Sequence, residues 1–563
     1  MQKFSELVYE RPDIPAVVKQ YEAYNAAFAA AKTFEEAKAV FEQVEALETH
    51  LYTAASLCNI RNTMDTTDEY YDAEMAYINE NMPNLIPASK VFNEAIVNGP
   101  FRAEFEAEYG VHFIKILENN LRIQDARIIE DLVKESELSV EYSKIAASCQ
   151  AEFRGETCNF YGLLKHMEST DRAERKEAFE KWAELYAGVA DKLDEVYDKL
   201  IEVRLSMAEK LGFENYTQLA YLNMGRLDYT PEHVAKFREQ VRTVITPAVA
   251  RMREKQAERL GLEKIRYYDE SLVFPYGNAD PMGKKDDMVQ AAAEMYAALS
   301  AETKEFFEFM TKYELFDLET RPGKHLGGYC TSLPDFKAPF IFSNFNGTSA
   351  DVDVLTHEAG HAFQCFLGER LIPVSTLQGS TSEINEIHSM AMEFFTYPWM
   401  EKFFGDRADE YRYAHLCDAL AVVPYMVTVD EYQHEVYKNP KMTAMERRAV
   451  WSDLEKKYMP WRDYDGNEFL ENGGFWMQKQ HIFLYPFYYI DYALAQICTF
   501  SLYSEMKTDR SAAWSRYLNL CRAGGTKGYF DLLHDAGIPV PFEEGAVESA
   551  VRGVIEEIEN AGY

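Results

Sequence analysis

The pentapeptide His357-Glu358-Ala359-Gly360-His361 constrains this chain more than any other feature. Successive residues of a helix are rotated by about 100°, so His357 and His361 lie on one face, one turn apart. Two neutral imidazoles in this arrangement are typical ligands of a divalent metal ion. Glu358 lies beside that line, where its carboxylate can reach a water molecule held by the metal. The sequence therefore predicts a helix that carries two metal ligands and a general base.

The residues around this helix indicate the class of fold. The run Phe340-Ile341-Phe342, flanked by glycines and prolines, is the best strand candidate, and it leads through a turn into the metal-binding helix. Elsewhere the apolar residues follow helical spacing, and 28 glycines and 20 prolines in 563 residues favour long helices. We expect a mainly α protein with a small β-sheet beside the metal helix. A helical lobe is expected over residues 1–200 and a catalytic domain over 201–563.

Charge and cysteine usage narrow the class of protein further. The net charge of −35 disfavours binding to nucleic acid and to anionic membranes. The amino terminus has no signal-peptide pattern, and no apolar run approaches the roughly 20 residues that span a bilayer. The eight cysteines are scattered singly. These features predict a cytoplasmic protein with reduced cysteines, and they leave monomer and homodimer open.

A catalytic zinc site needs a third protein ligand and leaves one position for water. Ser380 and Glu383 form a capping box that predicts a helix, on which Glu386 and Glu393 share one semi-buried face. A buried carboxylate must be paired or bound to metal, so Glu386 is the candidate ligand and Glu393 the partner that orients a ligand. Spacing alone leaves Glu383 open as the alternative ligand. His388 points off the Glu386 face and is interpreted as structural.

These motifs together resemble a known family. From Gly328 to Phe363 the chain has a Tyr-Cys loop, a proline-led strand, Asn-Phe-x-Gly, and Asp-Val-x-x-Leu-x-His-Glu-x-Gly-His. This pattern is similar to the thimet oligopeptidase and oligoendopeptidase F family of zinc metallopeptidases, in its bacterial oligoendopeptidase (Pz-peptidase-like) branch. In that family a glutamate 25 residues beyond the second histidine is the third ligand, and a serine follows three residues later. Glu386 and Ser389 match, so the resemblance implies one Zn²⁺ held by His357, His361 and Glu386.

The resemblance also implies a fold and a second wall of the site. Family members have helical lobes that enclose a deep channel. Pro486 predicts a helix start, on which Tyr485, Tyr489 and Tyr492 share one face while Tyr488 points elsewhere. Without the resemblance, aromatic residues at this helical spacing would be interpreted as core packing. Carried over by position, His481, Tyr489 and Tyr492 stabilise the transition state and Tyr485 lines the substrate cleft, with the roles of Tyr489 and Tyr492 not separated.

The expected function is zinc-dependent hydrolysis of internal bonds in short, unstructured peptides. The strand with Phe342 and Asn344 is expected to pair with the substrate backbone. One alternative is a helical zinc carboxypeptidase or dipeptidyl carboxypeptidase, for which Arg462 or Arg522 would grip the terminal carboxylate. The other is a non-catalytic peptide-binding protein, which the complete set of catalytic residue types disfavours.

Overall fold

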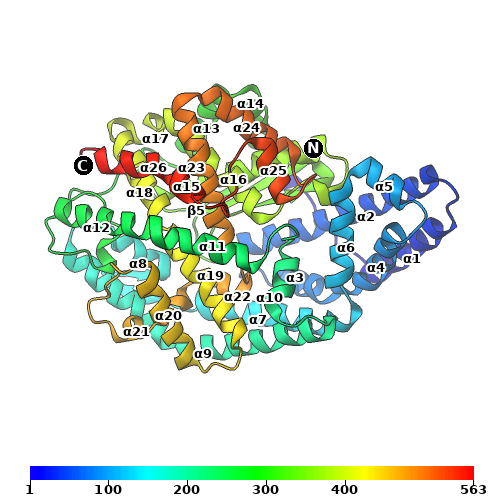
Figure 1. Ribbon diagram of the computed structural model, residues 1–563, viewed down its shortest axis with the longest axis horizontal. Coiled ribbons are helices and arrows are strands. Elements are labelled where there is room, and N and C mark those ends of the chain that lie inside the picture. The colour runs from blue at the N-terminus through cyan, green and yellow to red at the C-terminus, as the bar shows by residue number, and fades with distance from the viewer.

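The computed structural model describes residues 1–563, and helices dominate it, as predicted (Figure 1). The N-terminal helices form a lobe at one end of the molecule, with its own aromatic core around Phe41, Phe92 and Phe105. Its helices are α1 (Ile14–Ala30), α2 (Phe34–Met64), α4 (Ile86–Val97), α5 (Arg102–Tyr109) and α6 (Val111–Ile123), whereas α3 (Glu69–Asn81) packs against the larger core through Ile78. Ile372, Val374 and Leu377 also pack into this core, so the lobe is joined to the region near the metal motif.

A second, much larger core unites the rest of the chain. Its longest element, α9 (Arg172–Leu211), is one continuous helix of 40 residues. The domain boundary expected at residue 200 therefore falls inside a helix, and no structural break occurs there. The other helices before the sheet are α7 (Ile129–Ala147), α8 (Phe160–His166), α10 (Tyr216–Asn223), α11 (Pro231–Gln240), α12 (Thr246–Leu260), α13 (Lys285–Leu299) and α14 (Ala301–Lys312).

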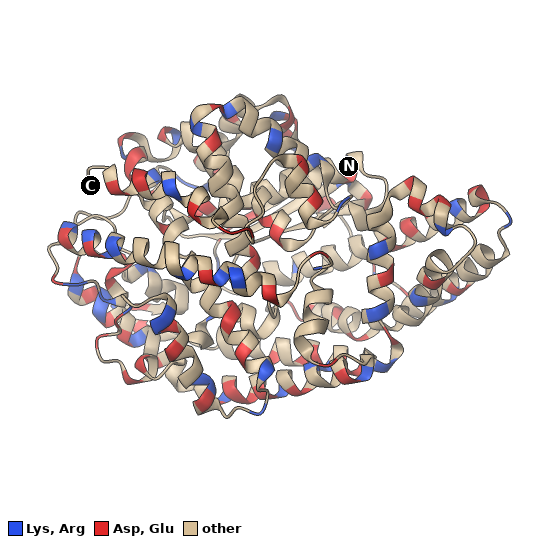
Figure 2. Cartoon of the chain, in the orientation of Figure 1, with Lys and Arg blue, Asp and Glu red and all other residues tan.

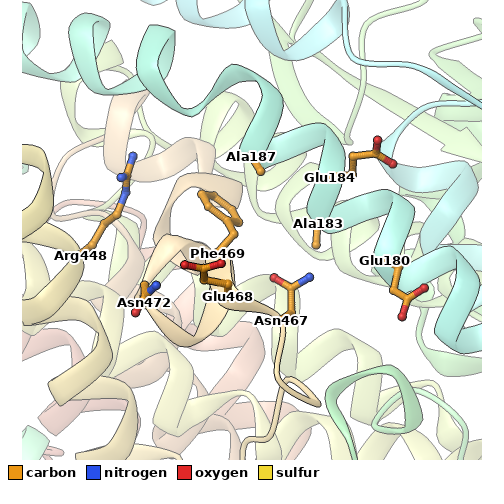
Figure 3. Close-up of a pocket in the computed structure, with 9 residues that line it drawn as sticks. All are labelled: Glu180, Ala183, Glu184, Ala187, Arg448, Asn467, Glu468, Phe469 and Asn472. Carbon is orange, nitrogen blue, oxygen red and sulfur yellow. The ribbon is translucent and has the colours of Figure 1, made fainter.

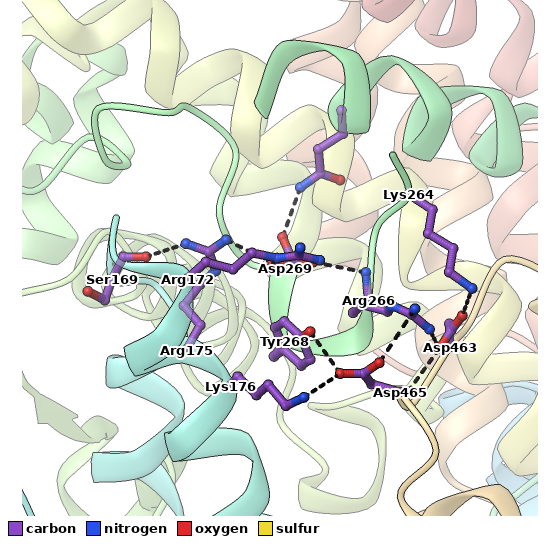
Figure 4. A network of polar contacts seen from close by, with 11 residues as sticks. Ser169, Arg172, Arg175, Lys176, Lys264, Arg266, Tyr268, Asp269, Asp463 and Asp465 are labelled. Carbon is purple, nitrogen blue, oxygen red and sulfur yellow. Dashed lines mark hydrogen bonds and ion pairs between the residues drawn. The ribbon is translucent and has the colours of Figure 1, made fainter. Parts of the chain in front are cut away.

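A buried polar network fixes the start of α9 to the remainder of the body (Figure 4). Asp269 is fully buried and accepts hydrogen bonds from Arg172 (2.8 and 3.1 Å) and Arg175 (2.8 Å). Lys176 reaches Asp465 at 2.8 Å. Because two guanidinium groups share one desolvated carboxylate, the position of α9 is strongly specified.

The main sheet is small and lies against the metal-motif helix. Its strands are β3 (Phe316–Glu319), β4 (Tyr329–Leu333) and β5 (Ala338–Phe345), in the order β3-β5-β4. The run Phe340-Ile341-Phe342 is fully buried because β5 is the central strand, parallel to β3 and antiparallel to β4. A separate hairpin joins β1 (Ala151–Phe153) to β2 (Glu156–Cys158).

Three helices meet beside this sheet: α15 (Ala350–Leu371), α16 (Ser382–Phe395) and α23 (Tyr489–Thr508). The remaining helices are α17 (Glu401–Phe404), α18 (Ala408–Ala421), α19 (Val423–Lys438), α20 (Ala444–Tyr458), α21 (Glu468–Glu471), α22 (Gln480–Leu484), α24 (Arg510–Ala523), α25 (Tyr529–Ala536) and α26 (Ala546–Asn560). None of these helices, nor any before them, has both the length and the apolar character needed to cross a bilayer. Acidic residues are distributed over all parts of the chain (Figure 2).

Candidate active site

The two histidines of the motif lie next to each other on α15. Their ring centroids are 5.1 Å apart and the ring planes are nearly perpendicular. Glu358, between them in sequence, is buried and its carboxylate lies beside Gly328, the residue before β4. Burial raises the pKa of Glu358, against the opposing influence of the two imidazoles. A carboxylate with a raised pKa is suited to accept and return a proton.

The neighbouring helix α16 brings a third group to this pair. Glu386 Oε2 lies 3.3 Å from His357 Nε2 and 3.4 Å from His361 Nε2. Burial raises the pKa of Glu386, but His361 and His357 outweigh it and hold the pKa well below its usual value. Two imidazole nitrogens and one carboxylate oxygen within 4.8 Å of one another fit the ligand set of a catalytic zinc ion.

The close approach of α15 and α16 depends on Gly360. A Cβ atom at this position would lie 2.6 Å from Ser389 Cα and would overlap the carbonyl oxygen of His388. Only glycine allows the two helix backbones to approach this closely. The glycine inside the motif therefore sets the distance between the histidines and Glu386.

A chain of hydrogen-bonded, largely buried side chains extends from His357, on the side of its ring away from Glu386. Glu393 joins His357 Nδ1 (2.6 Å) to His415 Nε2 (2.7 Å), and Tyr397 continues the chain to His415 Nδ1 at 2.6 Å. A carboxylate on Nδ1 fixes the orientation of the ring and leaves Nε2 free for a metal. Glu393 thus occupies the position expected for an orienting partner. His415 comes from α18 and was missed, because nothing in the sequence links it to the motif.

The expected alternative ligand, Glu383, lies elsewhere. It is buried, without a hydrogen-bond partner on either oxygen, and Arg226 is its nearest opposing charge. The predicted capping box is also wrong: Thr381 is the N-cap of α16, and the amide of Asn385 bonds the backbone of Ser380. His388 is fully buried, with both nitrogens unpaired, and burial lowers its pKa to about 3.

The tyrosine segment differs from the expectation in where its helix begins. The helix α23 begins at Tyr489 rather than at Pro486, and a turn with Phe487 at φ 65° precedes it. This turn rotates Tyr488 towards the cluster, where its hydroxyl donates to Glu386 Oε1 at 2.6 Å. The expectation that Tyr488 points elsewhere is therefore wrong, because it assumed an uninterrupted helix.

The other aromatic residues expected in the site differ in their position relative to the cavity. Tyr492 lines the cavity together with Tyr488. His481 lies among four tyrosine rings, with centroids 4.9 Å from Tyr489 and 5.9 Å from Tyr485, Tyr488 and Tyr492. Burial lowers the pKa of His481 to about 3, so its ring is neutral. Tyr489 is buried against His481 behind the cavity wall, and Tyr485 is exposed outside it.

The predicted substrate contacts on β5 are wrong. Both edges of this strand are already paired, so it offers no hydrogen bonds to a peptide. The ring of Phe342 is fully buried and stacks on Tyr329 at 4.8 Å. The amide of Asn344 holds the loop before β4 through His325 O (2.8 Å) and Gly327 O (2.7 Å). The edge strands of the sheet are β3 and β4, and of these β4 lines the cavity.

A cavity of about 680 Å³ joins these features. Its walls come from α2, β4, α15, α16, the segment 375–379, Tyr488 and Tyr492. Neither lysine nor arginine lines it. Arg462 is buried against Glu270 (3.0 and 3.2 Å), and Arg522 pairs with Glu302 at 3.0 Å. A second hollow, between α9 and residues 467–472, contains no histidine or cysteine (Figure 3).

Comparison with known proteins shows which family the chain belongs to. A model of the peptidase M3 N-terminal domain matches residues 4–124, and the model of peptidase family M3 matches residues 165–276 and 286–551. The chain belongs to peptidase family M3. The resemblance noted in the sequence is thus confirmed, and so is the mainly α fold.

Solved structures and curated relatives agree with this family. PZ peptidase A with an inhibitor has a TM-score of 0.97, with 44% identity over 99% of each chain. A Bacillus anthracis structure described as oligoendopeptidase F has a TM-score of 0.92 and 40% identity, over 99% of this chain and 98% of that one. Oligoendopeptidase F of Lactococcus lactis subsp. cremoris is 22% identical over 67% of this chain. That match spans 62% of the relative, and the match to oligopeptidase PepF of Bacillus subtilis spans 58%.

Proposed function

We propose that this M3 family member is a zinc-dependent oligoendopeptidase that hydrolyses internal bonds of short, unstructured peptides. One observation carries the proposal. The ligating atoms of His357, His361 and Glu386 converge at one wall of a cavity, with Glu358 beside them and the open edge of β4 along the same cavity. A peptide bound there would present its backbone to both the strand edge and the general base.

The residues of the chain divide the chemistry among them. When bound, a zinc ion supplies Lewis acidity, which lowers the pKa of water towards neutrality. Glu358 accepts the proton of the attacking water and delivers it to the departing amine. Tyr492 donates a hydrogen bond to the oxygen of the attacked carbonyl, and Tyr488 positions Glu386. His481 and Tyr489 support these tyrosines from behind.

The cavity favours an endopeptidase over a carboxypeptidase. An enzyme that recognises a terminal carboxylate needs a cation in the site, and the cavity has none. Two peptides that differ only in a free or amidated carboxyl terminus should therefore be cleaved at the same internal bond with similar kcat/KM. Strict dependence on the free carboxylate would refute this assignment.

The variant Glu358→Gln tests the mechanism. It preserves the shape of the side chain but cannot accept a proton, so we expect kcat to fall by several orders of magnitude, as typical of loss of an essential general base. Zinc content, measured by mass spectrometry, and peptide affinity, measured by calorimetry, should remain near wild type. Undiminished turnover would contradict the assigned base, and absence of zinc from the wild-type protein would contradict the metal site.

A further inference from the structure

The cavity contains a buried acidic group that neither metal binding nor proton transfer uses. Glu369 lies on α15, and its side chain lines the cavity although only 6% of the residue is exposed. Ser332 donates to Glu369 Oε1, whereas Oε2 has no hydrogen-bond partner. A desolvated carboxylate oxygen without a partner is costly, so it indicates an absent ligand that carries a positive charge or hydrogen-bond donors.

No neighbouring cation within the protein satisfies this group. Arg370 is adjacent in sequence, but its guanidinium lies over the ring of Phe366 (3.5 Å to the centroid) and donates to Lys337 O at 2.7 Å. Burial raises the pKa of Glu369, and the hydroxyl of Ser332, the charge of Arg370, the neighbouring thiol of Cys365 and the charge of Lys337 oppose it. The remaining cavity lining contains no lysine or arginine, and Glu48 adds a further acid on the α2 wall.

The position of Glu369 relative to the reacting centre can be measured along two elements. On α15, Glu358 and Glu369 are eleven residues apart, which is about 16 Å along the axis and close to three full turns. Along the neighbouring chain, Gly328, just before β4, lies beside Glu358, and Ser332 on β4 lies beside Glu369, a separation of about 13 Å. Both distances correspond to about four or five residues of an extended peptide.

The groove along β4 ends near Glu369. The 3-10 turn after β4 (Pro334–Phe336) is attached to α2, since Asp335 N donates to Thr53 Oγ1 at 3.0 Å and His50 Nδ1 lies 2.8 Å from Asp335 Oδ2. A peptide that extends along β4 from the reacting centre therefore reaches the acidic group where the groove closes. A carboxyl terminus would be repelled there, whereas an amino terminus would be attracted.

We propose that Glu369, with Ser332, forms a subsite for a cationic group of the substrate, four or five residues on the amino-terminal side of the cleaved bond. The group is either the free α-amino group of a short peptide or a lysine or arginine side chain at that position. Its placement requires the substrate to run antiparallel to β4. This inference rests on the proposed peptidase function and adds to it a preference for charge and for length.

Paired peptides test the subsite. Each pair shares one sequence and differs only in a free or acetylated amino terminus, and successive pairs place that terminus two to eight residues before the cleaved bond. A second series, acetylated throughout, compares lysine with norleucine at each of these positions. We expect the wild-type enzyme to prefer the cationic member by about tenfold in kcat/KM at four or five residues, the strength of a charged hydrogen bond. The series that shows the preference identifies the source of the charge.

The variant Glu369→Gln should reduce this ratio to about one, and Glu369→Asp, which retains the charge, should preserve part of it. Glu254→Gln removes an exposed acid of α12 and serves as the matched control with an unchanged ratio. A ratio that persists in Glu369→Gln, or a wild-type enzyme without any preference in either series, overturns the subsite. Failure of the zinc-loaded enzyme to cleave either member of any pair would instead overturn the proposed peptidase function.

Discussion

At the scale of single residues, the arrangement around Glu386 shows how the chain holds a buried carboxylate in one orientation. Tyr488 donates to Oε1 at 2.6 Å, and Ser389 donates to Oε2 at 2.9 Å. Both bonds fix the plane of the carboxylate relative to the two imidazoles. Groups that orient a metal ligand in this way commonly change metal affinity by 10- to 100-fold when they are removed.

We expect Tyr488→Phe to weaken zinc binding by about tenfold or more, because Glu386 Oε1 would be left buried without a donor. Competition with a chromophoric chelator measures the affinity. Tyr485→Phe is the matched control, since this tyrosine is 55% exposed and makes no hydrogen bond through its hydroxyl. Equal zinc affinity in Tyr488→Phe and the wild type would show that the bond to Glu386 contributes nothing to the site.

At the scale of elements, the site is the contact between α15 and α16. His357 and His361 belong to one helix and Glu386 to the other, so any change in the spacing of the helices changes the separation of the ligating atoms. Gly360 is the point of closest approach.

Gly360→Ala should therefore disrupt the site. The added methyl group meets backbone atoms of α16 that cannot rotate away, and overpacking of this kind costs about 1–3 kcal/mol. We expect a lower Tm and a weaker affinity for zinc. Thermal denaturation measures both, the first as the Tm without zinc and the second as the increase in Tm when zinc is added. Gly188→Ala in α9 is the control: nothing lies within 4 Å of its Cβ position, so the substitution should be neutral or slightly stabilising. A Gly360→Ala protein with wild-type zinc affinity would contradict this account.

The same scale explains which features the sequence could predict. The histidine spacing and the helical pattern of residues 382–395 depend on local periodicity, and the structure has both helices. By contrast, the apolar run of β5 reads identically for a central and an edge strand, because pairing partners are distant in sequence. The left-handed turn at Phe487 could not be predicted from the sequence either. Its backbone is held by Gln433 (2.9 Å) and Arg226 (2.7 Å), from two other parts of the chain.

At the scale of the whole molecule, the most prominent feature is the excess of acidic over basic residues. The net charge is −35, and most Asp and Glu residues are not buried, so water screens their charges. A few are enclosed by the fold. Glu455 on α20 is one of them, buried beneath the hydroxyl of Tyr464, and burial raises its pKa from 4.5 to about 7.

The sign of this shift determines how stability depends on pH. A carboxyl whose folded-state pKa exceeds its unfolded value stabilises the fold fully below about pH 4.5, and this contribution is lost as the pH rises through about 7. The shift corresponds to a change on the order of 3 kcal/mol, which in a chain of this length is about 2 °C in Tm. The protein should therefore lose this contribution between about pH 4.5 and about pH 7, with little further change at higher pH.

Glu455→Gln isolates this contribution, because glutamine still accepts the hydrogen bond of Tyr464 but never ionises. We expect the Tm of the variant to be equal to or slightly below that of the wild type at pH 5, and about 2 °C above it at pH 8.5. Scanning calorimetry at several pH values measures the difference. Glu254→Gln, at an exposed position, should show no such crossing. A Tm difference for Glu455→Gln that is independent of pH would mean that this carboxyl has the same charge state in the folded and unfolded chain, and that burial does not govern its titration.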